Sequence, residues 1–259
     1  MASAQEAILE TRDLVKTFKG FVAVDGVSLC VRRGEIHALI GPNGAGKTTF
    51  FNLLTKFLQP TSGAIFYRGR DITRENSADT ARRGIIRSFQ ICAVFPQLTV
   101  LENVRVALQR ALGTSFQFWR SANSLSRLDG RAMQLLAEVR LEDWYRTVAA
   151  DLPYGRKRAL ELATTLALEP ELMLLDEPTQ GMGHEDVSRV TQLIKHVAAR
   201  RTVLMVEHNM SVVASIADTI TVLQRGRVIA AGPYGKVAKD PQVIEAYMGA
   251  ASVAPVGSG

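Results

Sequence analysis

Hydrophobic and polar residues follow the patterns of short strands and one helix along the first third of the chain. An apolar run at 36–40 predicts a buried strand, and a glycine-rich loop separates it from a helix whose apolar positions continue from Phe50 to Leu58. Residues 14–31 alternate as antiparallel strands do, and 62–72 predict a hairpin that turns at 68–70. These patterns predict a strand, loop and helix unit flanked by a small antiparallel β layer.

The pattern becomes helical in the middle of the chain and then returns to strands. Helical periodicity extends from Thr99 to Leu168, apart from a polar, partly aromatic connection at 113–130. Apolar strands separated by helical segments follow at 171–177, 201–208 and 219–224. Because this alternation is typical of a parallel sheet, we predict an α/β fold in a single domain. Its expected parts are a core of 1–98 and 169–250 that includes the antiparallel layer, an inserted helical subdomain at 99–168 and a disordered tail at 251–259.

Composition adds that the chain resembles an ordinary globular protein. Of its 259 residues, 47% are hydrophobic and 22% are charged, and no apolar run approaches the roughly 18 residues that cross a bilayer. The first residues lack the basic and apolar regions of a secretion signal, so we expect the chain to remain in the cytosol. The net charge is +6, but the basic residues are scattered without an aromatic platform, so no nucleic-acid partner is expected. Cys30 and Cys92 lie in apolar surroundings and are expected to be reduced packing residues.

The glycine-rich loop carries the strongest chemical signal. It fits the pattern G-x-x-x-x-G-K-[ST], which arises by chance in roughly one chain in a hundred of this length. Because a strand enters the loop and a helix leaves it, backbone N–H groups and the helix dipole converge on a spot suited to phosphate. We expect Lys47 to reach the β and γ phosphate oxygens of a bound nucleotide and Thr48 to place its hydroxyl on Mg²⁺. The expected nucleotide-binding residues are Gly41, Pro42, Asn43, Gly44, Ala45, Gly46, Lys47, Thr48 and Thr49.

Two strand ends supply candidate groups for chemistry at a bound phosphate. The strand at 171–177 ends in Asp176 and Glu177, which can both face the phosphate side where the chain turns. We expect Asp176 to hold Mg²⁺ and Glu177 to orient and deprotonate the attacking water. His208 ends the strand at 201–208 on the edge where ligands collect, within reach of a γ-phosphate. Seen alone, the acidic pair also fits a solvated strand end, although less well, and such a histidine is more often a capping or packing residue.

The order of these motifs resembles that of ATP-binding cassette (ABC) ATPases. GPNGAGKT, RSFQ, a glycine-bearing segment, LLDEP and VEH occur in the order seen in that family and together cover nearly the whole chain. Further details are similar to the ATP-binding subunits of branched-chain amino acid type importers, namely LPYG, TFF after the lysine, LENVRVA, EHNM and the ending VIEAYMG. The resemblance implies a P-loop NTPase fold of the ABC ATPase type.

The same resemblance implies roles for three residues and a set of partners. Gln90 matches the residue that senses nucleotide and Mg²⁺ and couples to the membrane subunits, and His208 matches the switch histidine. Phe18 matches the aromatic residue that stacks on adenine. The implied partners are a second ATPase subunit, two membrane permease subunits and, indirectly, a periplasmic solute-binding protein. The chain would then lie at the cytoplasmic face of the inner membrane, as a peripheral subunit.

The signature segment departs from the family pattern. Where the family has LSGGQ, this chain has Leu152, Pro153, Tyr154, Gly155 and Arg156, so the serine hydroxyl is missing. Gly155 keeps the second glycine, and the resemblance implies that it contacts, in trans, the ATP held by the partner subunit. The aspartate expected in the D-loop is replaced by Gly183.

The helix predicted after this segment begins with three cations, Arg156, Lys157 and Arg158. Each cation at a helix start is disfavoured by roughly 0.3–1 kcal/mol, because the unsatisfied N–H groups there carry partial positive charge. In ABC proteins two ATPase subunits meet head to tail, so we expect the partner's ATP to supply the compensating anion. A solvated basic face is the alternative interpretation.

Together these observations predict an ATP-binding and ATP-hydrolysing subunit that powers uptake of a branched-chain amino acid or related solute by an ABC importer. Pro153 further predicts a heterodimeric ATPase pair, and the apolar run at 91–101 is expected to contact the membrane subunits. The alternatives are a soluble ABC ATPase of translation or DNA repair and a nucleotide-binding regulatory module. The first usually has two cassettes or a long coiled coil. The second is disfavoured because the chain retains Lys47, Asp176, Glu177 and His208.

Overall fold

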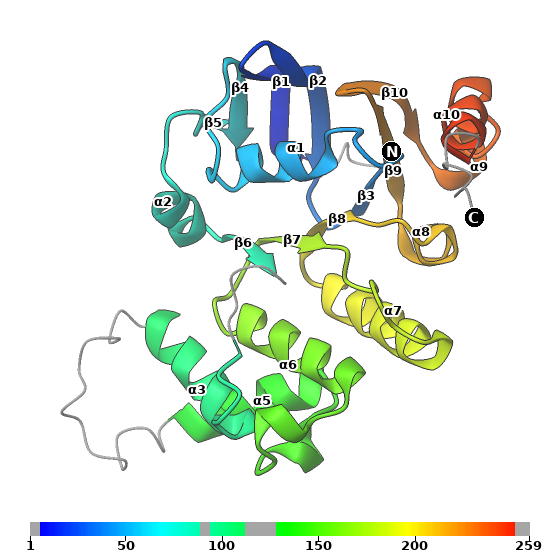
Figure 1. Ribbon diagram of the computed structural model, residues 1–259. Helices are drawn as coiled ribbons and strands as arrows, with labels where there is room; N and C mark the ends of the chain where they lie inside the picture. Colours follow the sequence, from blue (N-terminus) through cyan, green and yellow to red (C-terminus); the bar gives the residue numbers. More distant parts are fainter. Residues whose placement is uncertain (1–5, 89–93, 112–127, 252–259) are drawn as a thin grey trace, which may run out of the picture. The chain divides into compact units, whose positions relative to one another are not determined.

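The computed structural model describes residues 6–88, 94–111 and 128–251, which belong to two compact units (Figure 1). The first unit combines 1–83 with 202–259, and the second is 84–201. The second unit contains the whole predicted helical region together with one strand before it and one after it. Gln90, Cys92 and residues 252–259 of the predicted tail lie outside the described residues.

The first unit contains the predicted antiparallel layer as a four-stranded sheet. Its strands are β1 (Ala7–Phe18), β2 (Phe21–Arg32), β4 (Ser62–Tyr67) and β5 (Arg70–Asp71), in the order β2-β1-β4-β5. Val27, Leu29 and Val31 are buried whereas the residues between them are exposed, as the two-residue period of a strand requires. Cys30 is one of the exposed residues, so the expectation of a buried packing cysteine is wrong because this position faces outward on β2.

The same unit also contains the strand that leads into the glycine-rich loop. That strand, β3 (Ile36–Ile40), lies between β8 (Thr202–Val206) and β9 (Thr219–Gln224) and is parallel to both, while β10 (Arg227–Gly232) pairs antiparallel with β9. Every residue of β3 and β8 is buried, which explains why these strands are continuously apolar. The helices of this unit are α1 (Lys47–Leu54), α2 (Ser77–Arg82), α8 (Met210–Ile216), α9 (Tyr234–Val237) and α10 (Pro241–Ala251).

Helix α1 is shorter than the apolar pattern predicts. It ends at Leu54, four residues before the expected end, because the backbone at Lys56 turns into the left-handed region with φ 62°. The amide of Leu58 then bonds back to the carbonyl of Asn52. Phe57, counted as part of the apolar face, is 53% exposed, so the prediction for 55–58 is wrong.

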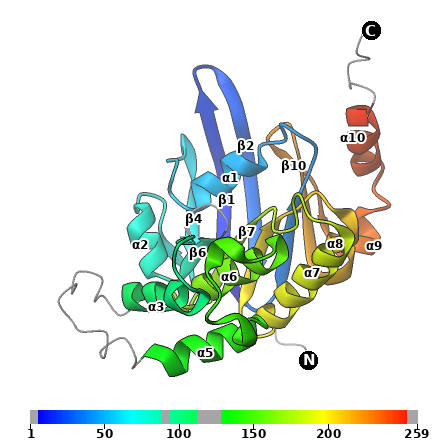
Figure 2. The same ribbon diagram turned by 60° about the horizontal axis from the view of Figure 1, so that its bottom comes forward.

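Within its described residues, the second unit combines two parallel strands with the helices α3 (Val100–Ala111), α5 (Asp129–Glu138), α6 (Tyr154–Leu166) and α7 (His184–Ala198). Strands β6 (Ile85–Ser88) and β7 (Leu172–Asp176) pair in parallel. Helices α3, α5 and α6 pack together, and α7 packs on α6 (Figure 2). Short 3₁₀ turns at Glu142–Trp144 and Ala149–Asp151 complete the connection to α6. Within the described parts of both units, no helix is long and apolar enough to cross a membrane.

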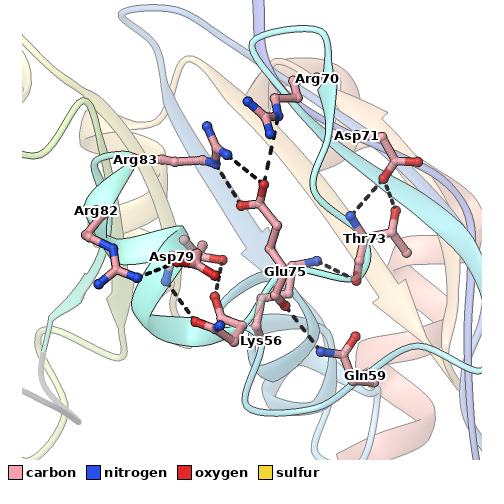
Figure 3. A network of polar contacts seen from close by, with 11 residues as sticks. Lys56, Gln59, Arg70, Asp71, Thr73, Glu75, Asp79, Arg82 and Arg83 are labelled. Atoms are coloured by element: carbon pink, nitrogen blue, oxygen red, sulfur yellow. Dashed lines mark hydrogen bonds and ion pairs between the residues drawn. The ribbon is translucent and has the colours of Figure 1, made fainter.

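A polar network joins the segment after β5 to α2 and to the end of α1 (Figure 3). Glu75 accepts two hydrogen bonds from the guanidinium of Arg83, each 2.7 Å long. Lys56 is 94% buried beside this network and donates to the carbonyl of Thr73 at 3.4 Å. Burial lowers the pKa of Lys56 to about 8, although the nearby carboxylates of Asp71 and Glu75 act in the opposite direction. Sequence patterns gave no sign of this buried lysine.

Candidate active site

The glycine-rich loop connects β3 to α1, and two of its glycines are required by close backbone contacts. Gly41 has φ +152°, and a Cβ atom on it would lie 2.1 Å from the carbonyl oxygen of Leu223 in β9. Gly46 has φ +99°, and its Cβ would lie 2.4 Å from the carbonyl oxygen of Ala23 in β2. No side chain fits at either position, so the loop is held against the ends of two strands by its own backbone.

The groups of this loop suit a polyphosphate. Lys47 is the first residue of α1, and its ammonium donates to the carbonyl oxygens of Gly41 at 2.7 Å and Pro42 at 3.0 Å. The amides of Gly44, Gly46 and Thr48 have no acceptor within the described part of the chain. N–H groups at a helix start, next to an ammonium, form a favourable environment for phosphate oxygens. The Thr48 side chain is exposed, so its hydroxyl is available to a cation bound with the phosphates.

His208 follows the strand next to the one that enters this loop. Strands β3 and β8 are parallel, with Leu39 opposite Val206, so their carboxyl ends lie at the same edge of the sheet. The amide of His208 donates to the carboxylate of Glu207 at 3.0 Å, which fixes the turn after β8, and the His208 side chain is exposed. The structure thus places the predicted switch histidine and the start of the phosphate loop on one edge of the first unit.

Phe18 ends β1 as an exposed ring. It is 40% exposed, pairs across the hairpin with Phe21, and has the ammonium of Lys16 at 5.1 Å from its centroid. An exposed aromatic ring on the layer that contacts the phosphate loop is compatible with base stacking.

Asp176 and Glu177 lie at the end of β7 in the second unit. The carboxylate of Asp176 forms an ion pair with Arg87, whose side chain is completely buried in β6. Glu177 follows with φ 48°, a left-handed conformation that is uncommon for a residue with a side chain. Asp176 is therefore the last residue of the strand, whereas Glu177 already lies in the turn. The two side chains need not point to opposite faces, as neighbours within a strand do.

The signature helix starts as predicted but without a side-chain cap. Pro153 is the N-cap residue of α6, and no side chain accepts a hydrogen bond from the first amides. Gly155 is buried, and a Cβ atom on it would lie 2.4 Å from Oδ1 of Asp186 in α7. A carboxylate of this chain therefore lies against the start of α6.

The cations at this helix start also have partners within the chain. Arg158 donates to Glu161 at 2.8 Å and to the Tyr154 hydroxyl at 2.9 Å, and the Arg156 guanidinium stacks over Trp144 at 4.0 Å. The charge of Arg158 is therefore already compensated by Glu161 of the same helix. Compensation of Arg156 and Lys157 by the partner's ATP stays a prediction.

Two family descriptions match this chain. The description "ABC transporter" matches residues 24–180, more than half of the chain, and "Branched-chain amino acid ATP-binding cassette transporter" matches 227–253. The chain belongs to the ATP-binding cassette family of transporters. As a member it is an ATPase coupled to transport, and an ATPase of translation or DNA repair is not favoured.

Curated relatives resemble this ABC ATPase over almost its full length. One is the high-affinity branched-chain amino acid transport ATP-binding protein BraF of Pseudomonas aeruginosa, 38% identical over 94% of this chain and 98% of the relative. Another is the high-affinity branched-chain amino acid transport ATP-binding protein LivG of Salmonella typhimurium. It is 37% identical over 95% of this chain and 99% of the relative.

Solved structures confirm the predicted fold class. The ADP conformation of MJ1267, an ATP-binding cassette of an ABC transporter, has a TM-score of 0.82 at 28% identity and covers 94% of this chain and 99% of its own. The dimeric bacterial cassette MJ0796 has a TM-score of 0.70 at 25% identity, covering 87% of this chain and 98% of its own.

Sequence reasoning missed two residues of this ABC ATPase that contact predicted site residues. They are Arg87, which pairs with Asp176, and Asp186, which lies against Gly155. A signal existed for Arg87, because an arginine inside the short apolar strand IIRS needs a buried partner. Asp186 does not stand out in the sequence without the fold.

Proposed function

We propose that this ABC ATPase powers the uptake of a branched-chain amino acid or a closely related solute. The observation that carries the proposal is the match of 227–253 to the branched-chain transporter description, on a chain that aligns over nearly all of BraF and LivG. These relatives are named for branched-chain amino acid transport, whereas the ABC description alone leaves the solute open.

Residues 41–49 bind the phosphates of ATP in this proposal. The exposed amides of the loop hold the phosphate oxygens, and Lys47 moves its ammonium from the Gly41 and Pro42 carbonyls to the β and γ oxygens. Phe18 stacks on the adenine with its exposed ring. The support is the geometry of the loop, in which two glycines are forced by backbone contacts and the lysine stands at the helix start.

Hydrolysis uses the carboxylates after β7 and the histidine after β8. Asp176, Thr48 and Gln90 would hold Mg²⁺, whose charge neutralises the phosphate oxygens as they develop negative charge. Glu177 holds the attacking water and accepts its proton, and His208 contacts the γ-phosphate and orients that water. Oxygen ligands from a carboxylate, a hydroxyl and an amide are the set that Mg²⁺ prefers, which supports this assignment.

The chain works with two kinds of partner. A second ATPase subunit completes this chain's site with its own signature segment, and Gly155 contacts the ATP of that subunit in trans. Two permease subunits dock on the apolar stretch that includes Phe95, which is 47% exposed, at the cytoplasmic face of the inner membrane. A periplasmic solute-binding protein delivers the solute to them.

The ATPase pair is a heterodimer. Pro153 offers neither a hydroxyl nor an N–H at the cap of α6, so the site that this chain completes for its partner is the weaker of the two. A partner with an intact signature would leave the site on this chain's own loop fully equipped.

Copurification and nucleotide titration test the proposal. The tagged chain should copurify with two permeases and a second ATPase, and the solute-binding protein encoded alongside should bind leucine, isoleucine or valine. Lys47→Ala should abolish Mg-ATP binding, whereas the exposed Lys195→Ala control should bind normally. Normal affinity in Lys47→Ala would contradict the site, and a binding protein specific for an unrelated solute would contradict the substrate.

A further inference from the structure

A pocket with basic residues lies in the second unit, between the end of α5, the start of α6 and one face of α7. Helices α5 and α7 both pack on α6, and the pocket among them has a volume of about 240 Å³ (Figure 1). We call it the basic pocket, because Arg140, Arg156, Arg189 and His196 are among the residues that line it.

The walls of the basic pocket are apolar. They include five buried residues, each at most 7% exposed: Val139, Leu141, Ala159, Val190 and Leu193. Ala159 contributes only a methyl group, which leaves space between α6 and α7 that a longer side chain would fill. An inorganic anion would leave these walls in contact with water, so they favour a ligand with an apolar body.

The cations come from all three sides of this apolar space. Arg189, Leu193 and His196 follow the spacing i, i+4, i+7, so two basic residues share one face of α7 with an apolar wall residue. Arg156 is near the start of α6, and its guanidinium lies 4.0 Å from the centroid of the Trp144 ring. This cation–π contact restricts the guanidinium to one place beside the pocket.

Arg140 is the basic residue with the least compensation. It lies in the turn after α5, where its φ is 58° and the Leu141 amide donates to the Leu136 carbonyl at 2.8 Å. Its side chain is exposed and forms no ion pair or hydrogen bond within the described part of the chain. Arg189, by contrast, donates to Asp186 at 3.3 Å. Since no acidic residue is among the described residues that line the basic pocket, its charge suits an anion.

We propose that the basic pocket binds a small carboxylate that carries a short aliphatic body. Guanidinium groups offer paired N–H donors that match the two oxygens of a carboxylate, and the apolar walls cover the body. Pockets for drug-sized ligands measure roughly 300–1,000 Å³, so a volume of about 240 Å³ suits a smaller molecule. A sugar phosphate fits less well, because its hydroxyl groups would face apolar walls without partners.

The basic pocket is a second ligand site of this ABC ATPase, separate from the phosphate loop. It includes Gly155 and Arg156 of the signature segment, so a bound carboxylate would contact two residues that we assign to the partner's ATP. Binding of the carboxylate itself does not depend on that assignment, nor on the transported solute.

Titration of the full chain with isocaproate, a branched short-chain carboxylate, tests the proposal. Its uncharged analogue isocaproamide and the shorter acetate are titrated in parallel, and the methyl signals of Leu193 are followed by NMR. A ligand of this size should bind with a Kd on the order of 1 mM. We expect isocaproate to shift the Leu193 methyl signals, and the amide and acetate to bind about tenfold more weakly or not at all.

Two substitutions test the charge and the space separately. Arg140→Gln removes an exposed guanidinium and should raise the Kd for isocaproate about threefold to tenfold. Arg200→Gln is the matched control, because this exposed arginine does not line the pocket, and it should leave the Kd unchanged. Ala159→Leu should fill the space beside α6 and abolish binding. If Ala159→Leu does not fold, the amide and Arg140→Gln decide the question.

Three results would overturn the inference. The first is the absence of isocaproate binding, or binding that leaves the Leu193 methyl signals unchanged. The second is equal affinity for isocaproate and isocaproamide, because the cations would then not select the ligand. The third is an unchanged Kd in Arg140→Gln or in folded Ala159→Leu, which would place the ligand elsewhere on the chain.

Discussion

The guanidinium of Arg87 is paired with the carboxylate of Asp176, and the arginine side chain has no exposed surface. The pair joins β6 and β7, which run in parallel with Ser88 opposite Leu175. A buried arginine beside a carboxylate that we assign to Mg²⁺ fixes the orientation of that carboxylate. The pair also makes the end of β7 sensitive to the loss of either partner, because a single buried charge would remain.

Arg87→Met should destabilise the protein by about 3–5 kcal/mol, since it leaves the Asp176 carboxylate without its counter-charge. Urea unfolding measures the effect. Arg87→Met combined with Asp176→Asn should recover part of the loss, because neither charge is then left alone. The exposed pair of Arg227 and Asp25 provides the control, and Arg227→Met should change stability by less than about 1 kcal/mol. A double variant as unstable as Arg87→Met would contradict this account of the pair.

Gly155→Ala should impair the transporter at the site of the partner subunit. The new Cβ atom would meet Oδ1 of Asp186 at 2.4 Å, so either the start of α6 or the carboxylate must shift. We expect lower ATPase activity of the assembled transporter and unchanged ATP affinity of the isolated chain. Gly183→Ala is the matched control, because a Cβ atom there meets nothing within 4 Å. Restored activity in Gly155→Ala combined with Asp186→Ala would identify the clash as the cause, and equal losses in both glycine variants would argue against it.

Lys56 should impose a pH dependence on stability. Its pKa is about 8 in the folded protein and 10.5 in the unfolded chain, so the unfolded chain binds more protons between these values. The free energy of unfolding should therefore rise as the pH increases from about 8 to 10.5. Below about pH 8, where the buried Lys56 is charged, its destabilising effect should be fully present. Lys56→Met should remove this slope and add about 1–3 kcal/mol of stability at pH 7. Denaturant unfolding at several pH values checks the slope, with the exposed Lys195→Met as control; an unchanged slope in Lys56→Met would refute the assignment.

The two ATP sites of the transporter should be unequal. Because Pro153 weakens the site that this chain completes, most turnover should occur on this chain's own phosphate loop. Glu177→Gln in this chain should therefore reduce ATPase activity far more than the matching change in the partner. Single-variant complexes in proteoliposomes provide the comparison. Equal losses, or an isolated chain that homodimerises on ATP and hydrolyses it at the transporter's full rate, would rule out the asymmetry.

The strands and the phosphate loop could be predicted because local pattern determines them. The continuous apolar run of β3, the alternation of β2 and the glycine pattern from Gly41 to Gly46 each follow from interactions close in sequence. The structure adds the reason why neither Gly41 nor Gly46 can carry a side chain: the backbone of β9 lies against Gly41, and that of β2 lies against Gly46.

Other features depend on contacts that no local pattern contains. The end of α1 is set by the left-handed backbone at Lys56, and β6 is too short for periodicity to identify it. Strand β10 and helices α2, α9 and α10 also went unpredicted, although the ending VIEAYMG was noted as similar to the importer family. The pairing of Arg87 with Asp176 and the approach of Asp186 to Gly155 join residues that are far apart in sequence, so only the fold reveals them.

The central claim is that ATP hydrolysis on this chain drives the uptake of branched-chain amino acids. Its most direct test is leucine accumulation in proteoliposomes that contain the two permeases, both ATPase subunits, the binding protein and Mg-ATP. We expect accumulation with the unmodified chain and a loss of roughly 100-fold or more with Glu177→Gln, since the amide cannot accept a proton from water. Leucine accumulation at the normal rate with Glu177→Gln, or none with the unmodified chain in a complex that still hydrolyses ATP, would contradict the claim.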